Sequence, residues 1–220
     1  MEIEAVLFDI DGTLVDSNED HVSAWSLAFR EAGFPQEPDD IRLQIGKGGD
    51  LLVPALLPQV GSALSSRIAE RHGALFEELY LDHVRAFDGA IALIDHVVAT
   101  GRKAVLASSA SGHELNHYVA LLGVADSLAA TTSIDDVESS KPEPDIFESA
   151  LRKIRTAPDR AIVVGDTPYD MEAAIRAGVM AIGVRSGPYD EGRLKEAGAM
   201  SLYADVADLL ANFVRSPLAS

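Results

Sequence analysis

The sequence predicts an α/β fold, with a parallel sheet core and a small all-helical domain inserted after the first strand. Short apolar runs alternate along the chain with segments of helical periodicity, the pattern of a parallel sheet covered on both faces. One long stretch, residues 15–84, interrupts this alternation and contains no good strand. A chain of 220 residues is long enough for one such core and a small insert.

The core elements can be placed in order along the chain. Apolar runs predict strands at residues 6–8, 104–107, 128–130, 161–164 and 180–184. Helical patterns between them predict helices at residues 91–100, 114–122, 144–154 and 169–177. Glycines at positions 101, 123 and 178 are placed as helix stop signals. Residues 1–14 and 85–220 therefore form the expected core domain.

The insert, residues 15–84, has its own helical signals. Ser17 begins a segment of the capping-box kind, and Val22, Trp25 and Phe29 then share one helical face that ends at Gly33. A second helical pattern spans residues 64–79, beyond a stretch rich in proline and glycine. We expect a helical cap whose two connections lie at the carboxyl ends of the strands, where open α/β sheets bind ligands.

Composition excludes several classes of function. The net charge is −17, a field that repels nucleic acid and anionic lipid, so neither is an expected partner. The chain has no cysteine, which excludes disulfides and thiol chemistry. No signal-peptide pattern and no segment of transmembrane length is seen in the sequence. We therefore expect a cytoplasmic protein, and a monomer.

Two carboxylates, Asp9 and Asp11, follow the first strand one residue apart. Alternation along a strand points them the same way, and Gly12 permits a tight turn after them. Such a pair repels unless a cation lies between the carboxylates or one of them is protonated. Mg²⁺ prefers oxygen ligands of this kind, and both solutions are useful in phosphoryl transfer. Taken alone, the pattern favours a simple polar turn, which is common.

Three further motifs follow later strands. Asp166 and Asp170 follow the strand at residues 161–164, and the shared carboxyl edge of a parallel sheet can bring Asp166 to Asp9. Ser108 and Ser109 end another strand, where hydroxyl and backbone N–H groups suit phosphate oxygens. Lys141, followed by proline, can bind phosphate and restrain the acidic groups.

In sequence and order, the segments DIDGTLVDS, ASSA, SKPEPD and GDTPYD resemble the four motifs of the haloacid dehalogenase (HAD) superfamily of phosphohydrolases. The insert resembles the family's helical cap, and the segment DSNEDHVSAW is similar to the phosphoglycolate phosphatase and β-phosphoglucomutase branch. The resemblance implies a Rossmann-like core and a Mg²⁺-dependent phosphatase acting on a small phosphorylated metabolite, such as a sugar phosphate or phosphoglycolate.

The resemblance also implies roles for individual residues. Asp9 would attack phosphorus and form an aspartyl phosphate, and Asp11 would protonate the leaving oxygen and then activate water. Mg²⁺ would be held by Asp9, the backbone carbonyl of Asp11 and Asp166, with Asp170 in support. We expect crowding by the other carboxylates to keep Asp11 protonated at the start.

The same resemblance implies that phosphoryl oxygens would be held by Ser108, the backbone of Ser109 and Lys141. His21 is expected either to hydrogen-bond near Asp11 or to lie on a helix surface. Lys47, in the cap segment IGKGGD, is expected either to meet a substrate anion or to be a solvated loop lysine.

Three alternative functions remain open. A phosphosugar mutase of the β-phosphoglucomutase kind would carry a cap arginine near residues 48–50, which here read Gly-Gly-Asp, so hydrolysis is favoured. A phosphonate hydrolase would need a Schiff-base lysine in the cap, and the context of Lys47 does not match. A non-enzymatic phosphoaspartate signalling module would be shorter and would carry adjacent acids on its first strand.

Overall fold

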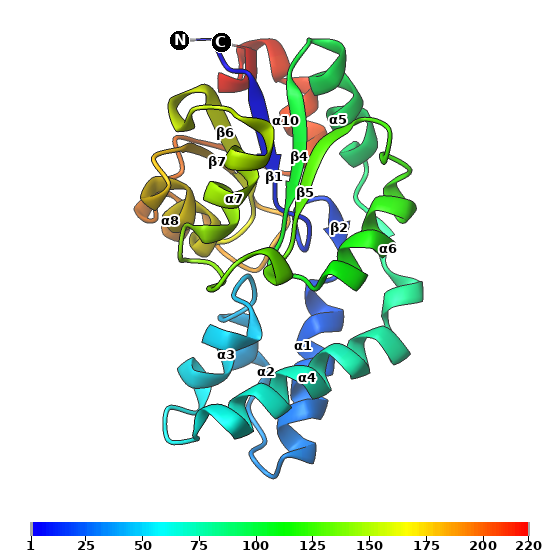
Figure 1. The fold of residues 1–220 in the computed structure, drawn as a ribbon, viewed down its shortest axis with the longest axis vertical. Helices are drawn as coiled ribbons and strands as arrows, with labels where there is room; N and C mark the ends of the chain where they lie inside the picture. The colour runs from blue at the N-terminus through cyan, green and yellow to red at the C-terminus, as the bar shows by residue number, and fades with distance from the viewer. Residues whose placement is uncertain (1, 220) are drawn as a thin grey trace.

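The computed structural model describes residues 2–219, and within them six parallel strands form one sheet. Their spatial order is β5, β4, β1, β6, β7 and β8 (Figure 1). The strands are β1 (Ala5–Phe8), β4 (Lys103–Ala107), β5 (Leu128–Thr132), β6 (Ala161–Gly165), β7 (Met180–Val184) and β8 (Ser201–Tyr203). The predicted α/β fold with a parallel sheet is confirmed.

Helices cover both faces of this sheet. They are α5 (Ala90–Ala99), α6 (Gly112–Leu122), α7 (Asp145–Ile154), α8 (Pro168–Arg176), α9 (Glu191–Glu196) and α10 (Val206–Ala211). Alternate strand residues enter separate apolar clusters: Val6 and Phe8 pack with α5 and α10, whereas Ala5 and Leu7 pack with α7 and α8. This two-sided burial explains why the strands read as continuous apolar runs.

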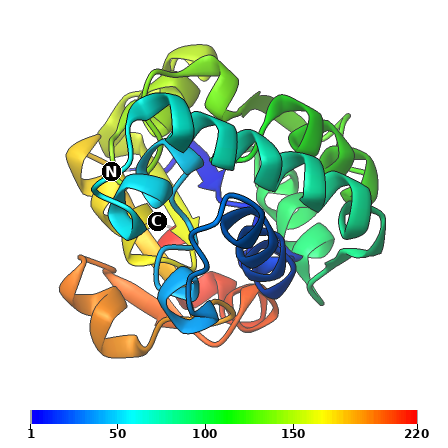
Figure 2. The same ribbon diagram turned by 90° about the horizontal axis from the view of Figure 1, so that it is seen from below.

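The insert consists of α1 (Asn18–Glu31), α2 (Pro38–Arg42), α3 (Gly49–Leu56) and α4 (Ser62–Leu79). These helices lie beyond the carboxyl ends of the strands, at the bottom of Figure 1; Figure 2 views them from below, with α1 end-on and α4 running across. Aromatic contacts join α1 to α4: the Trp25 and His72 rings stack at 3.8 Å between centroids, as do those of His21 and Phe76. We call α1–α4 the cap.

Two short strands connect the cap to the core. β2 (Val15–Asp16) leads into the cap and β3 (Arg85–Ala86) leads out of it, and they pair antiparallel, Val15 with Ala86 and Asp16 with Arg85. The two crossings of the chain therefore lie side by side. They lie where the predicted domain boundaries fall, and the division into two domains stays a prediction.

Several elements differ from the sequence predictions in extent. β5 continues two residues beyond the predicted end, to Thr132, and β8 was not predicted because it has three residues, all half-buried. Single-turn 3-10 helices occur at Leu81–His83, Ile134–Asp136, Pro158–Arg160, Phe213–Arg215 and Pro217–Ala219. Among the described residues, no helix combines the length and hydrophobicity needed to cross a membrane.

Candidate active site

The site lies where three neighbouring strands end. β1 is flanked by β4 and β6, and the residues that follow these strands directly are Asp9, Ser108 and Asp166. Parallel register aligns Phe8 with Leu106 on one side and with Val164 on the other. The fold thus places Asp9 between Ser108 and Asp166 at one edge of the sheet.

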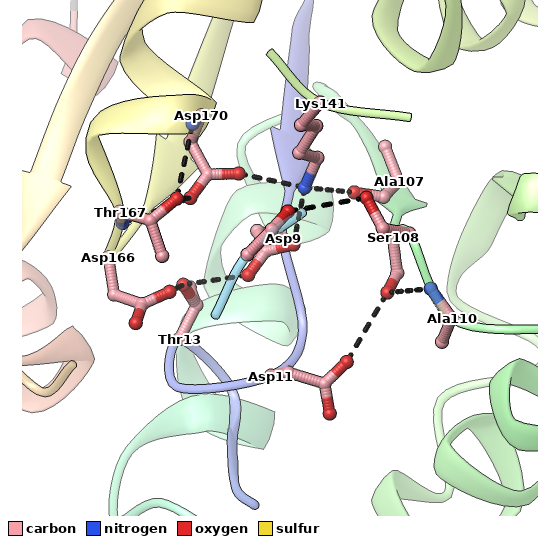
Figure 3. Close-up of polar contacts among 12 residues, drawn as sticks. Asp9, Asp11, Thr13, Ala107, Ser108, Ala110, Lys141, Asp166, Thr167 and Asp170 are labelled. Carbon is pink, nitrogen blue, oxygen red and sulfur yellow. Dashed lines mark hydrogen bonds and ion pairs between the residues drawn. The ribbon is translucent and has the colours of Figure 1, made fainter. Parts of the chain in front are cut away.

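Lys141 links the strand ends from the loop that precedes α7 (Figure 3). Its side chain is 1% exposed, and its ammonium group forms ion pairs with Asp9 and, at 2.7 Å, with Asp170 Oδ1. It also donates to the carbonyl oxygen of Ala107 at 3.1 Å. Burial would lower the pKa of Lys141, but the charges of Asp170 and Asp9 outweigh it and raise the pKa, so this lysine stays protonated.

Three buried carboxylates have the geometry of a cation site. One oxygen from each of Asp9, Asp166 and Asp170 lies within 4.8 Å of the others. Burial, together with the Asp170 charge, raises the pKa of Asp9 to about 7, and burial with the Asp9 charge raises that of Asp166 well above its usual range. Lys141 forms ion pairs with Asp9 and Asp170, so the three carboxylates outnumber the single ammonium group beside them. The donor set, all oxygen and all anionic, fits a hard divalent metal.

Room for the Asp166 carboxylate depends on two glycines. A Cβ on Gly187 would lie 1.8 Å from Asp166 Oδ2, and one on Gly12, where φ is +79°, would lie 2.2 Å from the same oxygen. The hydroxyl of Thr13 donates to Asp166 Oδ1 at 3.0 Å, and Asn18 Nδ2 donates to Oδ2 at 3.1 Å. These donors fix the carboxylate toward Asp9. Sequence analysis assigned no role to Thr13, Asn18 or Gly187.

Asp170 has a second, structural role. Its Oδ2 accepts hydrogen bonds from the backbone N–H and the hydroxyl of Thr167, while the Thr167 hydroxyl accepts from the Asp170 N–H. This capping box begins α8. Because Oδ2 accepts the hydrogen bonds of Thr167 at the start of α8, Oδ1 is the oxygen that faces Lys141.

Asp11 lies apart from this cluster and turns toward the cap and α6 (Figure 3). Its Oδ1 accepts from the hydroxyls of Ser17 at 2.6 Å and Tyr118 at 2.7 Å, and lies 3.2 Å from His21 Nε2. Its Oδ2 lies 3.5 Å from the Ser108 hydroxyl. His21 is therefore buried beside Asp11, and the helix-surface alternative is wrong.

The expected protonation of Asp11 is wrong. Burial would raise its pKa, but the charge and hydrogen bond of His21, with the hydroxyls of Ser17 and Tyr118, lower it to about 2. Asp11 in turn raises the pKa of His21, against the effect of burial. In this structure the shared proton therefore belongs to His21. Neighbouring carboxylates instead act on Asp9, whose pKa is raised by burial and by the charge of Asp170.

The predicted capping box at Ser17 is also wrong. Ser17 occupies the N-cap position of α1, yet its side chain makes no capping hydrogen bond there. Its hydroxyl donates to Asp11 instead. The Ser17 hydroxyl thus bonds a buried carboxylate instead of stabilising the start of α1, which indicates a functional constraint on this position.

His72, to which sequence analysis assigned no role, extends the group around Asp11. Its Nε2 lies 3.2 Å from His21 Nδ1, and its ring stacks on that of Trp25. Burial, and then the charge of His21, lower the pKa of His72 well below its usual range, so it is neutral. A neutral His72 can accept a hydrogen bond at Nε2 from the Nδ1–H of a charged His21. No local signal in the sequence marks this contact between residues 51 positions apart.

A cavity of about 420 Å³ opens between the cap and the core. Its lining includes Asp9, Asp11, Ser108, Ser109 and Lys47, so predicted site residues of the core and of the cap face one space. Ser108 Oγ accepts from the Ala110 N–H at 3.0 Å, in the turn that leads to α6. Lys47 Nζ donates to Gln44 Oε1 at 2.7 Å and lies 4.5 Å from the Tyr169 ring centroid.

Hydrogen bonds join cap and core on the side of the cavity formed by residues 43–50. The Gly48 N–H donates to Ser140 Oγ at 2.9 Å, and the Ser140 N–H donates to Asp50 Oδ2 at 3.0 Å. The Tyr169 hydroxyl donates to the Leu43 carbonyl at 2.7 Å. These contacts hold the cap against the core in this structure.

Comparison with known proteins agrees with the geometry. A phosphoglycolate phosphatase of Yersinia pseudotuberculosis is 30% identical over 217 residues, which cover 94% of this chain and 92% of that protein. Validoxylamine A 7'-phosphate phosphatase of Streptomyces hygroscopicus subsp. limoneus is 26% identical, with 90% and 92% covered. The crystal structure of a hydrolase from Pseudomonas syringae superposes with a TM-score of 0.90 at 31% identity, covering 96% of this chain and 98% of that one.

A family model described as haloacid dehalogenase-like hydrolase matches residues 6–184, a span that contains all four motifs and the whole cap. The resemblance inferred from the motifs is thereby confirmed: the chain belongs to the haloacid dehalogenase-like hydrolase family.

Proposed function

We propose that this protein is a Mg²⁺-dependent phosphatase that hydrolyses monoesters of a small phosphorylated metabolite through an aspartyl phosphate on Asp9. The observation that carries the proposal is the separation of Asp9 from Asp11. Only Ile10 separates them in sequence, yet they occupy different environments: Asp9 lies with Lys141 and two carboxylates, and Asp11 lies with His21 and two hydroxyls. Such separation assigns different chemical roles to two like groups.

In the first step a carboxylate oxygen of Asp9 attacks phosphorus, and the bond from phosphorus to the ester oxygen breaks. Lys141 and Asp170 orient Asp9, and Lys141 offsets charge on the phosphoryl oxygens. Ser108, with the backbone N–H of Ser109, would hold those oxygens. Asp9, the Asp11 carbonyl and Asp166 would hold Mg²⁺, which when bound neutralises the carboxylates and the phosphoryl group.

Asp11 and His21 together carry the proton. The leaving oxygen takes a proton through Asp11, which the His21 imidazolium replenishes; in the second step Asp11 removes a proton from the water that attacks the phosphoaspartate. The products are an alcohol and inorganic phosphate, with both aspartates regenerated. Neutral His72 supports the charged form of His21.

The cap supplies enclosure and selection. Its residues line the cavity beside Asp9 and Asp11, and its two connections pair at β2 and β3. Closure of such a domain excludes water from the first step and selects the alcohol. We expect this enzyme to be a cytoplasmic monomer.

A phosphate-release screen over phosphorylated metabolites, with and without Mg²⁺, tests this function. Asp9→Asn should abolish turnover, whereas Asp16→Asn, an exposed carboxylate on β2, should leave it intact. Near-normal turnover by Asp9→Asn would show that the mechanism is wrong. Transfer of the phosphoryl group between positions of a sugar, without release of phosphate, would favour the mutase alternative.

A further inference from the structure

Asn18, the first residue of α1, contacts the carboxylate cluster from the side of the cap. It is 7% exposed, and its Nδ2 donates to Asp166 Oδ2 at 3.1 Å. A Cβ on Gly12 would lie 2.2 Å from both of these atoms, so a side chain at position 12 would displace them. A residue of the cap thus reaches one of the three carboxylates that are suited to a cation.

The hydrogen bond to Asp166 determines which way the Asn18 amide group is turned. An ionised carboxylate only accepts hydrogen bonds, so the NH₂ group of Asn18 must face it. Turning the amide over would place Oδ1, an acceptor, against the carboxylate oxygen, also an acceptor. Because Oδ1 and Nδ2 belong to one planar group, Oδ1 is held beside the cluster without being bonded to Asp166.

Oδ1 of Asn18 is a buried acceptor to which no donor within residues 2–219 is bonded. The donors of the cluster are already used. The Lys141 ammonium group contacts two carboxylates and a backbone carbonyl, and the Thr13 hydroxyl donates to Asp166 at 3.0 Å. A buried acceptor without a donor costs free energy, and buried polar groups in folded proteins are almost always bonded. The Asn18 carbonyl therefore calls for a donor other than these side chains.

The start of α1 gives Asn18 no role in stabilising the helix. Asparagine is a favourable N-cap residue, but the N-cap position belongs to Ser17, and Asn18 follows it. The side chains of both residues are directed to the core instead: Ser17 donates to Asp11, and Asn18 donates to Asp166. Asn18 is therefore explained by the site and not by the helix that it begins.

We infer that Asn18 is a positioning residue of the cation site: Nδ2 orients Asp166, and Oδ1 accepts a hydrogen bond from a water molecule bound to the divalent cation. A cation makes its bound water a stronger donor, and Mg²⁺ keeps several waters when it binds carboxylates. Residues that hydrogen-bond to the ligands of a metal orient them and raise the metal affinity. The inference rests on the proposed Mg²⁺-dependent function and adds a residue of the cap to its site.

Calorimetric titration of the full chain with Mg²⁺ measures the contribution of Asn18 without any turnover. Asn18→Ala removes the donor and the acceptor together and should weaken Mg²⁺ binding by about 10–100-fold. Asn212→Ala is the matched control, because it also removes a hydrogen-bonded asparagine, one that bonds Asp208 at the end of α10. Mg²⁺ affinity should be unchanged in this control. Circular dichroism checks that both variants are folded.

A crystal structure of the unmodified protein with Mn²⁺, located by its anomalous scattering, tests the contact of Oδ1 directly. We expect a water molecule bound to Mn²⁺ at hydrogen-bond distance, about 2.5–3.0 Å, from Asn18 Oδ1. An asparagine that only orients Asp166 would make no such contact. This measurement needs no substitution, so it decides the inference even where Asn18→Ala does not fold.

The outcomes separate the role of Asn18 from the proposed function. If the unmodified protein and Asn18→Ala bind Mg²⁺ equally, Asn18 has no role at the cation, and the inference is wrong while the proposed function stands. If Asn18→Ala binds Mg²⁺ more weakly but no water bound to Mn²⁺ contacts Oδ1, the inferred water contact is wrong. If the unmodified protein binds no divalent cation, the proposed Mg²⁺-dependent function itself fails.

Discussion

Replacing Lys141 by methionine tests whether the charge of this lysine stabilises the folded protein against repulsion between the buried carboxylates Asp9 and Asp170. Methionine is close to lysine in volume and removes the charge, so the buried space stays filled. The change leaves Asp9 and Asp170, both buried, without the ammonium group that contacts them. We expect a large loss of stability in the absence of a divalent metal.

The expected loss of stability follows from the burial of the ion pairs that Lys141 forms with Asp9 and Asp170. Removing one partner of a buried ion pair costs about 3–5 kcal/mol, because the remaining charge is uncompensated. For a domain of this length, each kcal/mol lowers the melting temperature by about 2–4 °C. Lys141→Met should therefore melt about 6–20 °C below the unmodified protein in EDTA at pH 8.

The charge argument has a direct check in a second substitution. In the Lys141→Met background, Asp9→Asn should recover part of the lost stability, about 1–3 kcal/mol, because it removes one of the unpaired carboxylates. Asp16→Asn in the same background should recover none, since Asp16 is exposed on β2. Urea denaturation of the unmodified protein, Lys141→Met, Asp9→Asn and the double variant measures the coupling. Strict additivity of Lys141→Met and Asp9→Asn would refute the reasoning.

Three further expectations concern the neighbouring groups. Mg²⁺ affinity, measured by thermal shift, should weaken as the pH falls below about 7, because burial raises the pKa of Asp9 to about 7 and protons then compete with the metal. Tyr118→Phe removes the 2.7 Å hydrogen bond to Asp11 and should cost about 1.5–3 kcal/mol at pH 6. Because the pKa of Asp11 is lowered to about 2 on folding, its stabilisation is complete above pH 4, and the cost of Tyr118→Phe should shrink as the pH falls from 4 to 2. Gly187→Ala places a methyl group 1.8 Å from Asp166 Oδ2 and should weaken Mg²⁺ binding by about 10–100-fold, by calorimetry or thermal shift.

Control variants and contradicting outcomes can be stated for the Mg²⁺-binding and Tyr118→Phe predictions. Gly61→Ala, where a new Cβ has no neighbour within 4 Å, should leave Mg²⁺ affinity unchanged. Equal Mg²⁺ affinity in Gly187→Ala and the unmodified protein would show that Asp166 is not a ligand. A cost of Tyr118→Phe that stays constant from pH 6 to pH 2 would contradict the assigned interaction with ionised Asp11.

The strand ends were predictable from sequence because parallel topology constrains them strongly. Apolar runs at β1, β4 and β6 end at Asp9, Ser108 and Asp166, and a parallel sheet must place those ends on one edge. Lys141 was found for a different reason, since a carboxylate-rich edge requires a cation. The sheet order itself was not needed to find these residues.

The surroundings of Asp11 were not predictable in the same way. Tyr118 lies in the middle of a helix 107 residues away, and His72 lies on a cap helix, so only the packing of α1 against α4 and of the cap against α6 brings them near. The expectation of a protonated Asp11 considered neighbouring carboxylates alone. The structure adds His21, Ser17 and Tyr118, and these reverse the direction of the pKa shift.

The paired strands β2 and β3 also determine what can move. Displacement in a rigid rotation grows with distance from its axis, and an axis through these strands passes close to Ser17 and Asp11. Such a rotation of the cap would therefore separate Gly48 from Ser140. It would displace Ser17 much less relative to Asp11, because these residues lie near the axis. A rotation about these strands would keep Asp11 beside Ser17 and would open the cavity on the side of Gly48 and Ser140.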